Sequence, residues 1–286
     1  MSGPKLGFIG FGEAGSNLAA GLLEQGLSDI AAYALECRKV DGVTEHADAA
    51  SAIAGRDIVI SAVTANVALE VAEMCAPLLS PGQIYIDVNS VSPGTKKKIA
   101  DVINGAGARF VEVSIMGAVP GPRHTVPILM CGAAAPDVIA ALSPYGMNLT
   151  DLGPDYGRAA ATKMFRSVMI KGLEALLQEC VLGASKYGAA EQVLESVGEG
   201  YPGVDWVELA HHMLGRTAVH GTRRAAEMDE VAATLAELGI EPMMASAAAK
   251  RIRWAADHGL KEKFGTKGPE SFHEVLEILY RPDGAR

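Results

Sequence analysis

The stretch GFIGFGEAG, residues 7–15, lies almost at the start of the chain and contains glycines spaced G-x-G-x-x-G. A short apolar run spans residues 6–10, and a helix-like run follows at residues 14–23. A glycine-rich turn that leaves a strand and opens a helix brings the pyrophosphate of a dinucleotide against unpaired backbone N–H groups. Three glycines in an alanine-rich chain can also form an ordinary turn, but this position at the start of a βαβ unit favours dinucleotide binding.

Each glycine of the turn has its own steric role in that interpretation. Gly10 permits the tight turn, Gly12 lets the backbone approach the pyrophosphate, and Gly15 lets the helix pack closely on the strand. We expect the rest of the cofactor site at the carboxyl ends of later strands, where ligands of doubly wound sheets bind. The predicted cofactor-binding residues are Gly10, Phe11, Gly12, Glu13, Ala14, Gly15, Arg38, Lys39, Val63, Thr64 and Asn89.

The first half of the chain alternates between strand-like and helix-like segments, whereas the second half is helical. Further strands are expected at residues 29–33, 57–63, 84–88, 109–113 and 126–131, with helices at residues 65–79 and 93–103. This alternation predicts a parallel, doubly wound sheet. Helices are then expected at residues 156–186, 205–214, 217–238 and 242–258, with Asp155 as the N-cap of the first. The predicted fold is a Rossmann α/β domain over residues 1–155 and an all-helical substrate and dimerisation domain over residues 156–286.

Composition and charge narrow the class of partner. The chain has 286 residues, is 49% hydrophobic and carries a formal net charge of −9, which argues against nucleic acid or an anionic membrane as a partner. No run approaches the ~18 apolar residues of a membrane span, and no basic and then apolar leader opens the chain. The four cysteines lack metal-ligand spacing. We therefore expect a cytoplasmic protein with reduced thiols, no metal site and a small-molecule substrate.

The end of the second predicted strand bears on the choice between NAD and NADP. An NAD-binding turn of this kind places an acidic residue there, against the ribose hydroxyls. Here Ala34 is neutral, whereas Arg38 and Lys39 can hold a 2′-phosphate. This pattern favours NADP. The alternatives are that Arg38 and Lys39 form a solvated loop and that Glu36 reaches the ribose of NAD.

Four motifs, taken in order, resemble those of the β-hydroxyacid dehydrogenase superfamily, which includes 6-phosphogluconate and 3-hydroxyisobutyrate dehydrogenases. Residues 7–15 are similar to its G-F-I-G-x-G-x-M-G opening, and DVNSVSP, residues 87–93, to its D-x-S-T-x-x-P motif. SIMGA, residues 114–118, falls at its S-G-G substrate loop, and GRAAATKMFRS, residues 157–167, at its G-x-x-x-x-x-K-x-x-N-N catalytic motif. The resemblance spans the whole chain and implies an NAD(P)-dependent oxidoreductase.

The chain also departs from the family pattern at three positions of the substrate pocket. Met116 stands where the S-G-G serine is usual, and Arg166 and Ser167 replace the two asparagines after the lysine. The C-terminal K-D-x-x-x-A-like segment is represented only loosely, by residues 223–228. These differences indicate a bacterial branch with a divergent helical domain, whose substrates are not those of the well-known members.

The resemblance implies that Lys163 is the general acid/base of a hydride transfer. Oxidation of an alcohol releases the hydroxyl proton, and a positioned base must accept it. Nearby cations and partial desolvation are expected to lower the pKa of Lys163 toward neutrality. By periodicity alone, the basic residues of this helix would form a solvated face. The predicted substrate-binding residues are Asn89, Ser114, Arg166, Ser167, Lys171 and Arg223.

Three readings of the function are therefore compared. The leading one is a dehydrogenase or reductase that acts on a small hydroxy acid or related alcohol. The alternatives are an imine reductase, which usually lacks the lysine, and a non-catalytic dinucleotide-binding protein. A homodimer is also expected, because the helical half would otherwise leave a long apolar face. That face consists of Val204, Trp206, Leu209, Met213, Val231, Leu235 and Leu238.

Overall fold

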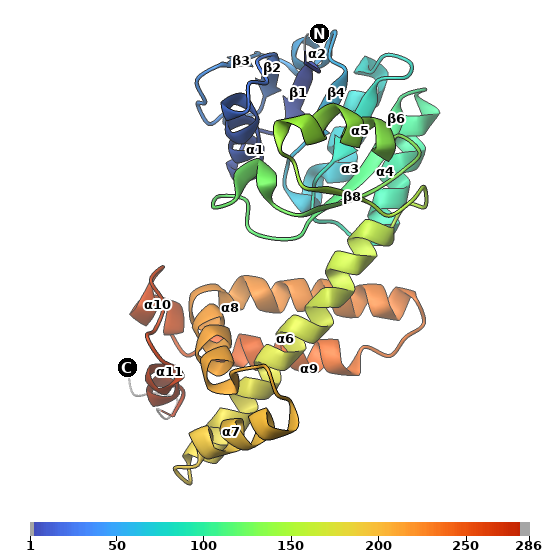
Figure 1. Ribbon diagram of the computed structural model, residues 1–286. Coiled ribbons are helices and arrows are strands. Elements are labelled where there is room, and N and C mark those ends of the chain that lie inside the picture. The colour runs from blue at the N-terminus through green and yellow to red at the C-terminus, as the bar shows by residue number, and fades with distance from the viewer. Residues whose placement is uncertain (1–2, 281–286) are drawn as a thin grey trace. The chain divides into compact units, whose positions relative to one another are not determined.

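The computed structural model describes residues 3–280 (Figure 1). The chain forms two compact units that divide between Lys163 and Met164, inside a single long helix. The first unit is an α/β layer structure, and the second consists of helices in its described residues. The predicted fold class, a Rossmann domain followed by an all-helical part, is confirmed.

The first unit is built on one sheet of eight strands in the order β3-β2-β1-β4-β5-β6-β7-β8. The strands are β1 (Leu6–Ile9), β2 (Ile30–Tyr33), β3 (Val43–Glu45), β4 (Ile58–Ser61), β5 (Ile84–Asp87), β6 (Arg109–Ile115), β7 (Ile128–Cys131) and β8 (Leu149–Asp151). Parallel pairing joins β1 through β6, and the register sets Ile9 beside Ser61 and Ser61 beside Asp87. The carboxyl ends of β1, β4 and β5 therefore lie side by side.

Strand β7 departs from the predicted parallel sheet, because it pairs antiparallel with β6. Residues 116–127, between these strands, form a loop with one short 3₁₀ turn, η3 (Arg123–Thr125), instead of a crossover helix. A parallel neighbour needs such a crossover, so the chain returns in the opposite direction. Strand β8 then pairs parallel with β7 through the helix α5 (Ala135–Leu142), which was not predicted.

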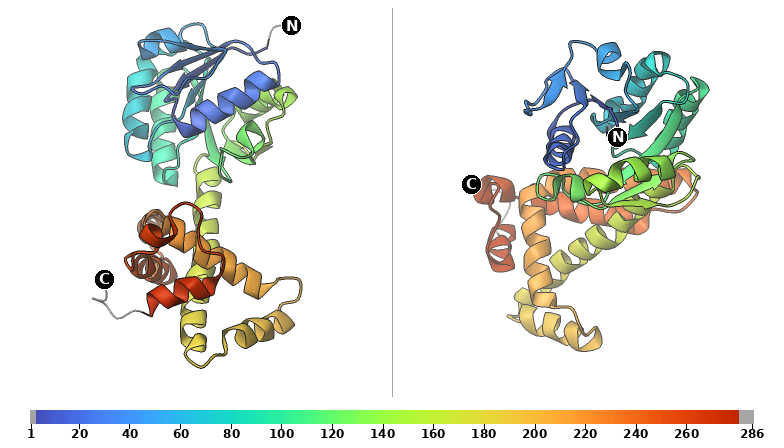
Figure 2. Two further views of the ribbon diagram at one scale, coloured as in Figure 1. Left: turned by 90° about the vertical axis from the view of Figure 1, so that its left-hand side faces the viewer. Right: turned by 45° about the horizontal axis from the view of Figure 1, so that its top comes forward.

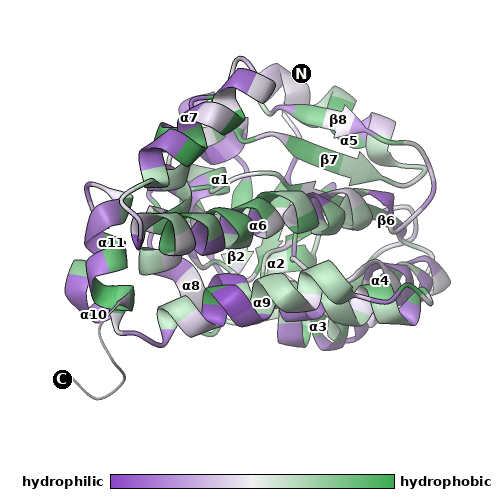
Figure 3. Ribbon diagram, turned by 90° about the horizontal axis from the view of Figure 1, so that it is seen from below, coloured by the Kyte–Doolittle hydropathy of each residue, from purple (hydrophilic) through white to green (hydrophobic). Residues whose placement is uncertain are grey.

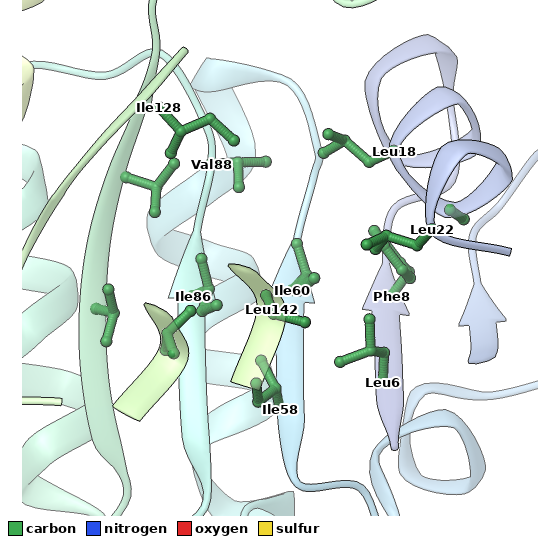
Figure 4. Packing of buried hydrophobic residues seen from close by; sticks show 14 of the residues in the cluster. Leu6, Phe8, Leu18, Leu22, Ile58, Ile60, Ile86, Val88, Ile128 and Leu142 are labelled. Carbon is green, nitrogen blue, oxygen red and sulfur yellow. The ribbon is translucent and has the colours of Figure 1, made fainter. Parts of the chain in front are cut away.

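Helices cover both faces of the sheet (Figure 2). On one face α1 (Glu13–Glu24) and α5 pack on side chains such as Phe8, Ile58 and Ile60, which Figure 4 shows together with Leu18 and Leu22 of α1. On the other face lie α2 (Ala49–Ile53), α3 (Ala68–Cys75) and α4 (Pro93–Gly105). Short 3₁₀ turns complete this unit, namely η1 (Ala65–Val67), η2 (Ala76–Leu78) and η4 (Ser143–Tyr145). Because neighbouring strand residues alternate between the two cores, the central strands are mostly apolar on both faces, and their few polar residues, such as Ser61 and Asp87, are buried.

Within its described residues, the helical unit contains more helices than the sequence predicted. Its helices are α6 (Arg158–Ser185), which begins in the first unit, α7 (Ala190–Gly200), α8 (Trp206–Glu237), α9 (Met243–Ala256), α10 (Leu260–Phe264) and α11 (Phe272–Leu279). The two helices expected at residues 205–214 and 217–238 are one helix, α8. Gly215 lies inside this helix, and an ideal Cβ there would lie 3.8 Å from Pro269. Figure 3 shows hydrophilic and hydrophobic residues alternating along α6, α8 and α9.

Much of the apolar face that was expected to require a second subunit is covered within the helical unit itself. Met213 and Val231 are buried in its two cores, and Trp206, Leu209 and Leu235 pack against them. Val204 and Leu238 remain exposed. Helices α8 and α9 approach closely, since a Cβ at Gly221 would lie 2.8 Å from the Cβ of Ala256. The homodimer stays a prediction, and of the apolar face proposed for it only Val204 and Leu238 are exposed large side chains.

The loop between β6 and β7 is anchored on α1 by a buried histidine. His124 is 6% exposed, and a Cβ at Gly21 of α1 would lie 2.0 Å from its Nδ1. Among the described residues neither ring nitrogen has a hydrogen-bond partner. Burial lowers the pKa of His124, Arg123 acts in the same direction, and Glu24 opposes both. The folded protein therefore holds this ring in its neutral form.

We predict that acid weakens the fold through His124. Below the unfolded pKa of about 6.5, the unfolded chain binds a proton that the folded chain does not. The free energy of unfolding therefore falls as the pH drops through that value toward the lower folded pKa. Urea unfolding from pH 7.5 to 5 checks this, with a loss of about 1.4 kcal/mol per unit of pKa difference. His124→Gln should flatten this dependence and His212→Gln, on the surface, should not; the same slope in both variants would contradict the assignment.

Candidate functional site

Two glycines of the 7–15 turn are required by the fold itself. Gly10 has φ of +86°, and a Cβ there would lie 2.5 Å from the carbonyl oxygen of Ala62. A Cβ at Gly15 would lie 2.9 Å from the carbonyl oxygen of Gly10. Side chains at these positions would push β1, α1 and the end of β4 apart, which agrees with the predicted roles of tight turn and close helix packing.

Gly12 differs, because no protein atom lies within 4 Å of an ideal Cβ at this position. Gly12 is also the N-cap of α1, and no side chain caps this helix start. Uncapped N–H groups at a helix N-terminus, beside space that a side chain would fill, suit an anionic group such as a pyrophosphate. The residues of the turn therefore fit a bound dinucleotide.

The segment after β2 is tied to the same turn. The backbone N–H of Arg38 donates to the carbonyl oxygen of Phe11 over 3.1 Å, so residues 37–39 run beside the glycine turn. The side chains of Glu36, Arg38 and Lys39 are all exposed. The two cations predicted to read a 2′-phosphate thus follow the strand that neighbours the glycine turn.

Asn89 bridges the carboxyl ends of β4 and β5. It is 4% exposed; its Oδ1 accepts from the backbone N–H of Val63 at 2.7 Å, and its Nδ2 donates to Ser61 Oγ at 3.0 Å. The structure therefore brings together two of the predicted cofactor residues, Asn89 and Val63, while Thr64 beside them is exposed. Through these two hydrogen bonds the amide of Asn89 links the segments that follow β4 and β5, which form the rim of the candidate site.

A buried ion pair, which the sequence did not predict, lies behind this rim. Lys96 of α4 is fully buried, and its Nζ lies 3.4 Å from Asp87 Oδ1 and donates to the carbonyl oxygens of Asp87 (2.8 Å) and Val113 (3.0 Å). Burial raises the pKa of Asp87, and Lys96 opposes that shift. Lys96 was overlooked because it opens a run of three lysines, a pattern typical of a solvated helix face.

Lys163, near the start of α6, contacts the loop that follows β5. Its Nζ donates to Ser90 Oγ over 2.8 Å. This contact joins two of the sequence motifs, residues 87–93 and 157–167, within the first unit. Ser90 was not among the predicted site residues, although it lies inside a motif that was recognised.

The start of α6 is held by Glu112 of β6, and the predicted N-cap is wrong. Glu112 is fully buried and accepts from the backbone N–H of Gly157 and, at 2.7 Å, from that of Ala160. Asp155 is exposed, and the helix begins at Arg158. Gly157 has φ of +97°, which turns the chain between Asp155 and the helix.

The remaining predicted substrate residues lie in different environments. Ser114 is 4% exposed within β6, where it pairs with Leu129, and Arg166 of α6 is exposed. In the helical unit Lys171 donates to Ser167 Oγ at 3.3 Å and pairs with Glu227 Oε2 at 2.7 Å. Glu227 also pairs with Arg223.

Glu227 thus joins Lys171 and Arg223, which lie far apart in the chain, and Ser167 reaches it through Lys171. Burial lowers the pKa of Lys171, and Glu227 counteracts this shift. Burial raises the pKa of Glu227, but Lys171 and Arg223 together lower it by more than burial raises it. The net shift of this pKa is therefore downward. Sequence reasoning missed Glu227, although its spacing of four residues from Arg223 on a helix was a usable signal.

The neighbour of Arg223 has a different environment. Arg224 is buried, and its Nε donates to both carboxylate oxygens of Glu174, at 3.0 and 2.9 Å. Thr217 donates to the same carboxylate, and Gln178 Nε2 donates to Thr217 Oγ1 at 2.6 Å. A buried, fully engaged guanidinium of this kind ties α6 to α8.

Comparison with known proteins agrees with this geometry. The NAD binding domain of 6-phosphogluconate dehydrogenase matches residues 5–150, and a domain of unknown function, DUF1932, matches residues 184–255. An uncharacterized 28.5 kDa protein of Methanothermus fervidus is 30% identical over 245 residues, which cover 84% of this chain and 94% of that protein.

An enzyme and a solved structure extend the comparison. The mitochondrial 3-hydroxyisobutyrate dehydrogenase of Drosophila melanogaster is 27% identical over 220 residues, 74% of this chain and 64% of that enzyme. The crystal structure of a conserved hypothetical protein from Sinorhizobium meliloti 1021 is 37% identical, with a TM-score of 0.85, and the match covers 98% of this chain and 96% of that one.

The doubly wound sheet, its glycine turn and the matched domain define a dinucleotide-binding protein of the Rossmann class. The matched nucleotide-binding domain, residues 5–150, covers more than half of the 286 residues. The chain therefore belongs to the β-hydroxyacid dehydrogenase superfamily. Within the described residues, the helices are too short or too polar to cross a membrane.

We predict that Gly12→Val abolishes binding of the nicotinamide cofactor while leaving the fold intact. The added side chain meets open space in the protein but fills the volume that a pyrophosphate needs. Isothermal titration with NADH and NADPH should show a loss of at least about 100-fold in affinity, which is about 2.8 kcal/mol. The melting temperature without cofactor should be unchanged. Gly15→Val, which clashes with Gly10, should instead unfold the protein at lower temperature; cofactor binding by Gly12→Val as tight as by the wild type would contradict the assignment.

Proposed function

We propose that this protein is an NAD(P)-dependent dehydrogenase or reductase that interconverts a small hydroxy acid, or related alcohol, and the corresponding carbonyl compound, with Lys163 as general acid/base. The observation that carries the proposal is the 2.8 Å contact between Lys163 Nζ and Ser90 Oγ, at the carboxyl end of β5. Ligands of doubly wound sheets bind at this end of the strands.

The proposed reaction needs a proton acceptor and a cofactor. The bound nicotinamide supplies or receives the hydride. During oxidation Lys163 accepts the proton of the substrate hydroxyl, and during reduction it returns that proton to the forming alkoxide. The hydroxyl of Ser90 suits both directions, because a serine can accept from an ammonium group and donate to a neutral amine. Ser90 therefore holds the lysine in one position in either protonation state.

We infer that the substrate is an anion and that basic residues of the helical unit recognise it. Lys171, Arg223 and Arg166 are the candidates, and Ser167 accompanies Lys171. Glu227 already pairs with Lys171 and Arg223, so an incoming carboxylate would compete with it or leave Arg166 as its main contact. Ser114 is buried in β6, which argues against its direct contact with substrate.

Substitution of Lys163 tests the proposal. Lys163→Ala should reduce kcat for oxidation of the active hydroxy acid by about 10²- to 10⁴-fold. Lys163→Arg keeps the positive charge but cannot release a proton, and we expect it to be equally slow. Steady-state kinetics should use a panel of small hydroxy acids, including 3-hydroxyisobutyrate, with each cofactor. The affinity for cofactor should be unchanged in both variants.

The control and the contrary outcomes are equally specific. Lys98→Ala, which removes an exposed lysine of α4, should keep wild-type turnover. Normal turnover by Lys163→Ala would refute the acid/base role. Reduction of cyclic imines without alcohol oxidation would support the imine reductase. Tight cofactor binding without turnover across the panel would support a non-catalytic dinucleotide-binding protein.

For the cofactor we propose NADP, on the basis of the segment after β2. Arg38 is tied to the glycine turn through its backbone and is followed by Lys39, while Ala34 provides no carboxylate for the ribose of NAD. The competing contact would come from Glu36, which is exposed in the same loop.

Arg38→Ala should weaken NADPH binding by about 10- to 100-fold, since a charge-assisted hydrogen bond contributes about 1.5–3 kcal/mol. Binding of NADH should change little, because NADH has no 2′-phosphate. Fluorescence titration of both cofactors measures the two constants. Arg109→Ala, at the amino end of β6, is the matched control and should alter neither. Tighter binding of NADH than NADPH by the wild type would overturn the proposal.

We also propose a homodimer that works in the cytoplasm, with residues 1–155 binding cofactor and residues 156–286 binding substrate and a second subunit. The exposed side chains of Val204 and Leu238 support the dimer. The family supports the division of labour, because its nucleotide-binding domain matches residues 5–150.

A further inference from the structure

Glu112 lies on an interior strand of the sheet of the first unit. It is fully buried on β6, where the register sets it beside Asp87 of β5 and Cys131 of β7. A carboxylate in such a place must be compensated by donors, because burial of an unpaired charge is strongly unfavourable. The structure supplies two donors, the backbone N–H groups of Gly157 and Ala160.

These two donors have a special position in α6. Gly157 precedes the first helical residue, and Ala160 is the third residue of the helix. They are the N–H groups that a capping box satisfies from within one helix. Here a single carboxylate of another element satisfies both, so the position of α6 is fixed relative to β6 at its first turn.

Lys163 follows Ala160 by three residues, so it lies on the same side of α6 one turn further along. From there its Nζ reaches Ser90 Oγ at 2.8 Å. The loop that carries Ser90 follows Asp87, which pairs with Lys96, and Lys96 also donates to the carbonyl oxygen of Val113, the neighbour of Glu112. The contacts therefore form a closed circuit through β6, α6, β5 and α4.

We propose that Glu112 is a positioning residue for the acid/base lysine: its carboxylate fixes the first turn of α6 so that Lys163 Nζ stays at Ser90. This inference rests on the proposed function of Lys163. It assigns Glu112 no contact with substrate or cofactor. A carboxylate that only stabilised the fold would leave the reactivity of Lys163 unaffected once the protein was folded.

The first experiment measures the reactivity of the lysine without any substrate. Limited acetylation of the folded full-length protein with acetic anhydride, read by mass spectrometry, should label Lys163 several-fold faster in Glu112→Gln than in the wild type. Glu112→Asp keeps the charge on a shorter side chain and should lie between the two. Asp205→Asn makes the same carboxylate-to-amide change at another helix start, α8, where the Asp205 Oδ1 accepts from the N–H of Glu208 at 2.9 Å, and it should leave Lys163 labelling unchanged.

The second experiment is a double-mutant cycle on turnover of the hydroxy acid identified by the screen. Glu112→Gln should lower kcat by about 10- to 100-fold, the scale expected for a small displacement of a catalytic group. In a Lys163→Ala background the same change should have no further effect, because Glu112 acts through that lysine. The affinity for NADPH should stay within about twofold, which is about 0.4 kcal/mol.

The outcomes separate the two proposals. Unchanged labelling of Lys163 in folded Glu112→Gln, or additive effects in the cycle, would overturn the positioning role while leaving Lys163 as acid/base. Normal turnover by Lys163→Ala would overturn the proposed function, and the labelling would still decide whether Glu112 positions the amine. If Glu112→Gln does not fold, the comparison of Glu112→Asp with Asp205→Asn gives the same decision.

Discussion

The hydrogen bonds that the Glu112 carboxylate accepts from the backbone at the start of α6 are the constraint on which the geometry of the site depends. A helix start leaves N–H groups that need acceptors, and a buried carboxylate needs donors, so each satisfies the other. The strands β4, β5 and β6 are in register, and Glu112 lies beside Asp87. The long helix is thereby fixed to the part of the sheet that carries Asn89 and Ser90.

A second buried charge completes this arrangement. Lys96 donates to the carbonyl oxygens of Asp87, at the end of β5, and of Val113, within β6, and it meets the Asp87 carboxylate in a buried site. Such a pair contributes little net stability, because desolvation offsets the attraction, but removing one partner leaves a charge uncompensated. The pair instead fixes how β5 and β6 lie against α4, because Lys96 binds groups on both strands. The glycine turn of β1 and α1 needs no such device, because the close contacts at Gly10 and Gly15 already determine it sterically.

The sequence predicted the features that depend on local pattern, and it could not predict those that depend on distant partners. β-branched runs and the G-x-G-x-x-G spacing identified β1, β4, β5 and the turn before α1, whereas the cofactor contacts of that turn and the role of Lys163 stay predictions. Glu112 caps a helix start 48 residues away, and Lys96 is buried within a run of lysines; neither has a signature in its own neighbourhood. The strand β7 was predicted, but its antiparallel direction was missed for a similar reason, since the length of residues 116–127 does not show whether they form a helix or a loop.

The basic residues that the sequence placed on one face of α6 lie in different environments. Lys171 pairs with the carboxylate of Glu227, which favours the ammonium form, but burial outweighs this contact and the net shift of the pKa of Lys171 is downward. Lys163 contacts the hydroxyl of Ser90, which can hydrogen-bond an ammonium group or a neutral amine alike. Two lysines of one helix therefore have different partners, a hydroxyl at Lys163 and a carboxylate at Lys171. The acid/base role proposed above is assigned to Lys163 because its partner accommodates both protonation states, whereas the partner of Lys171 favours only the charged one.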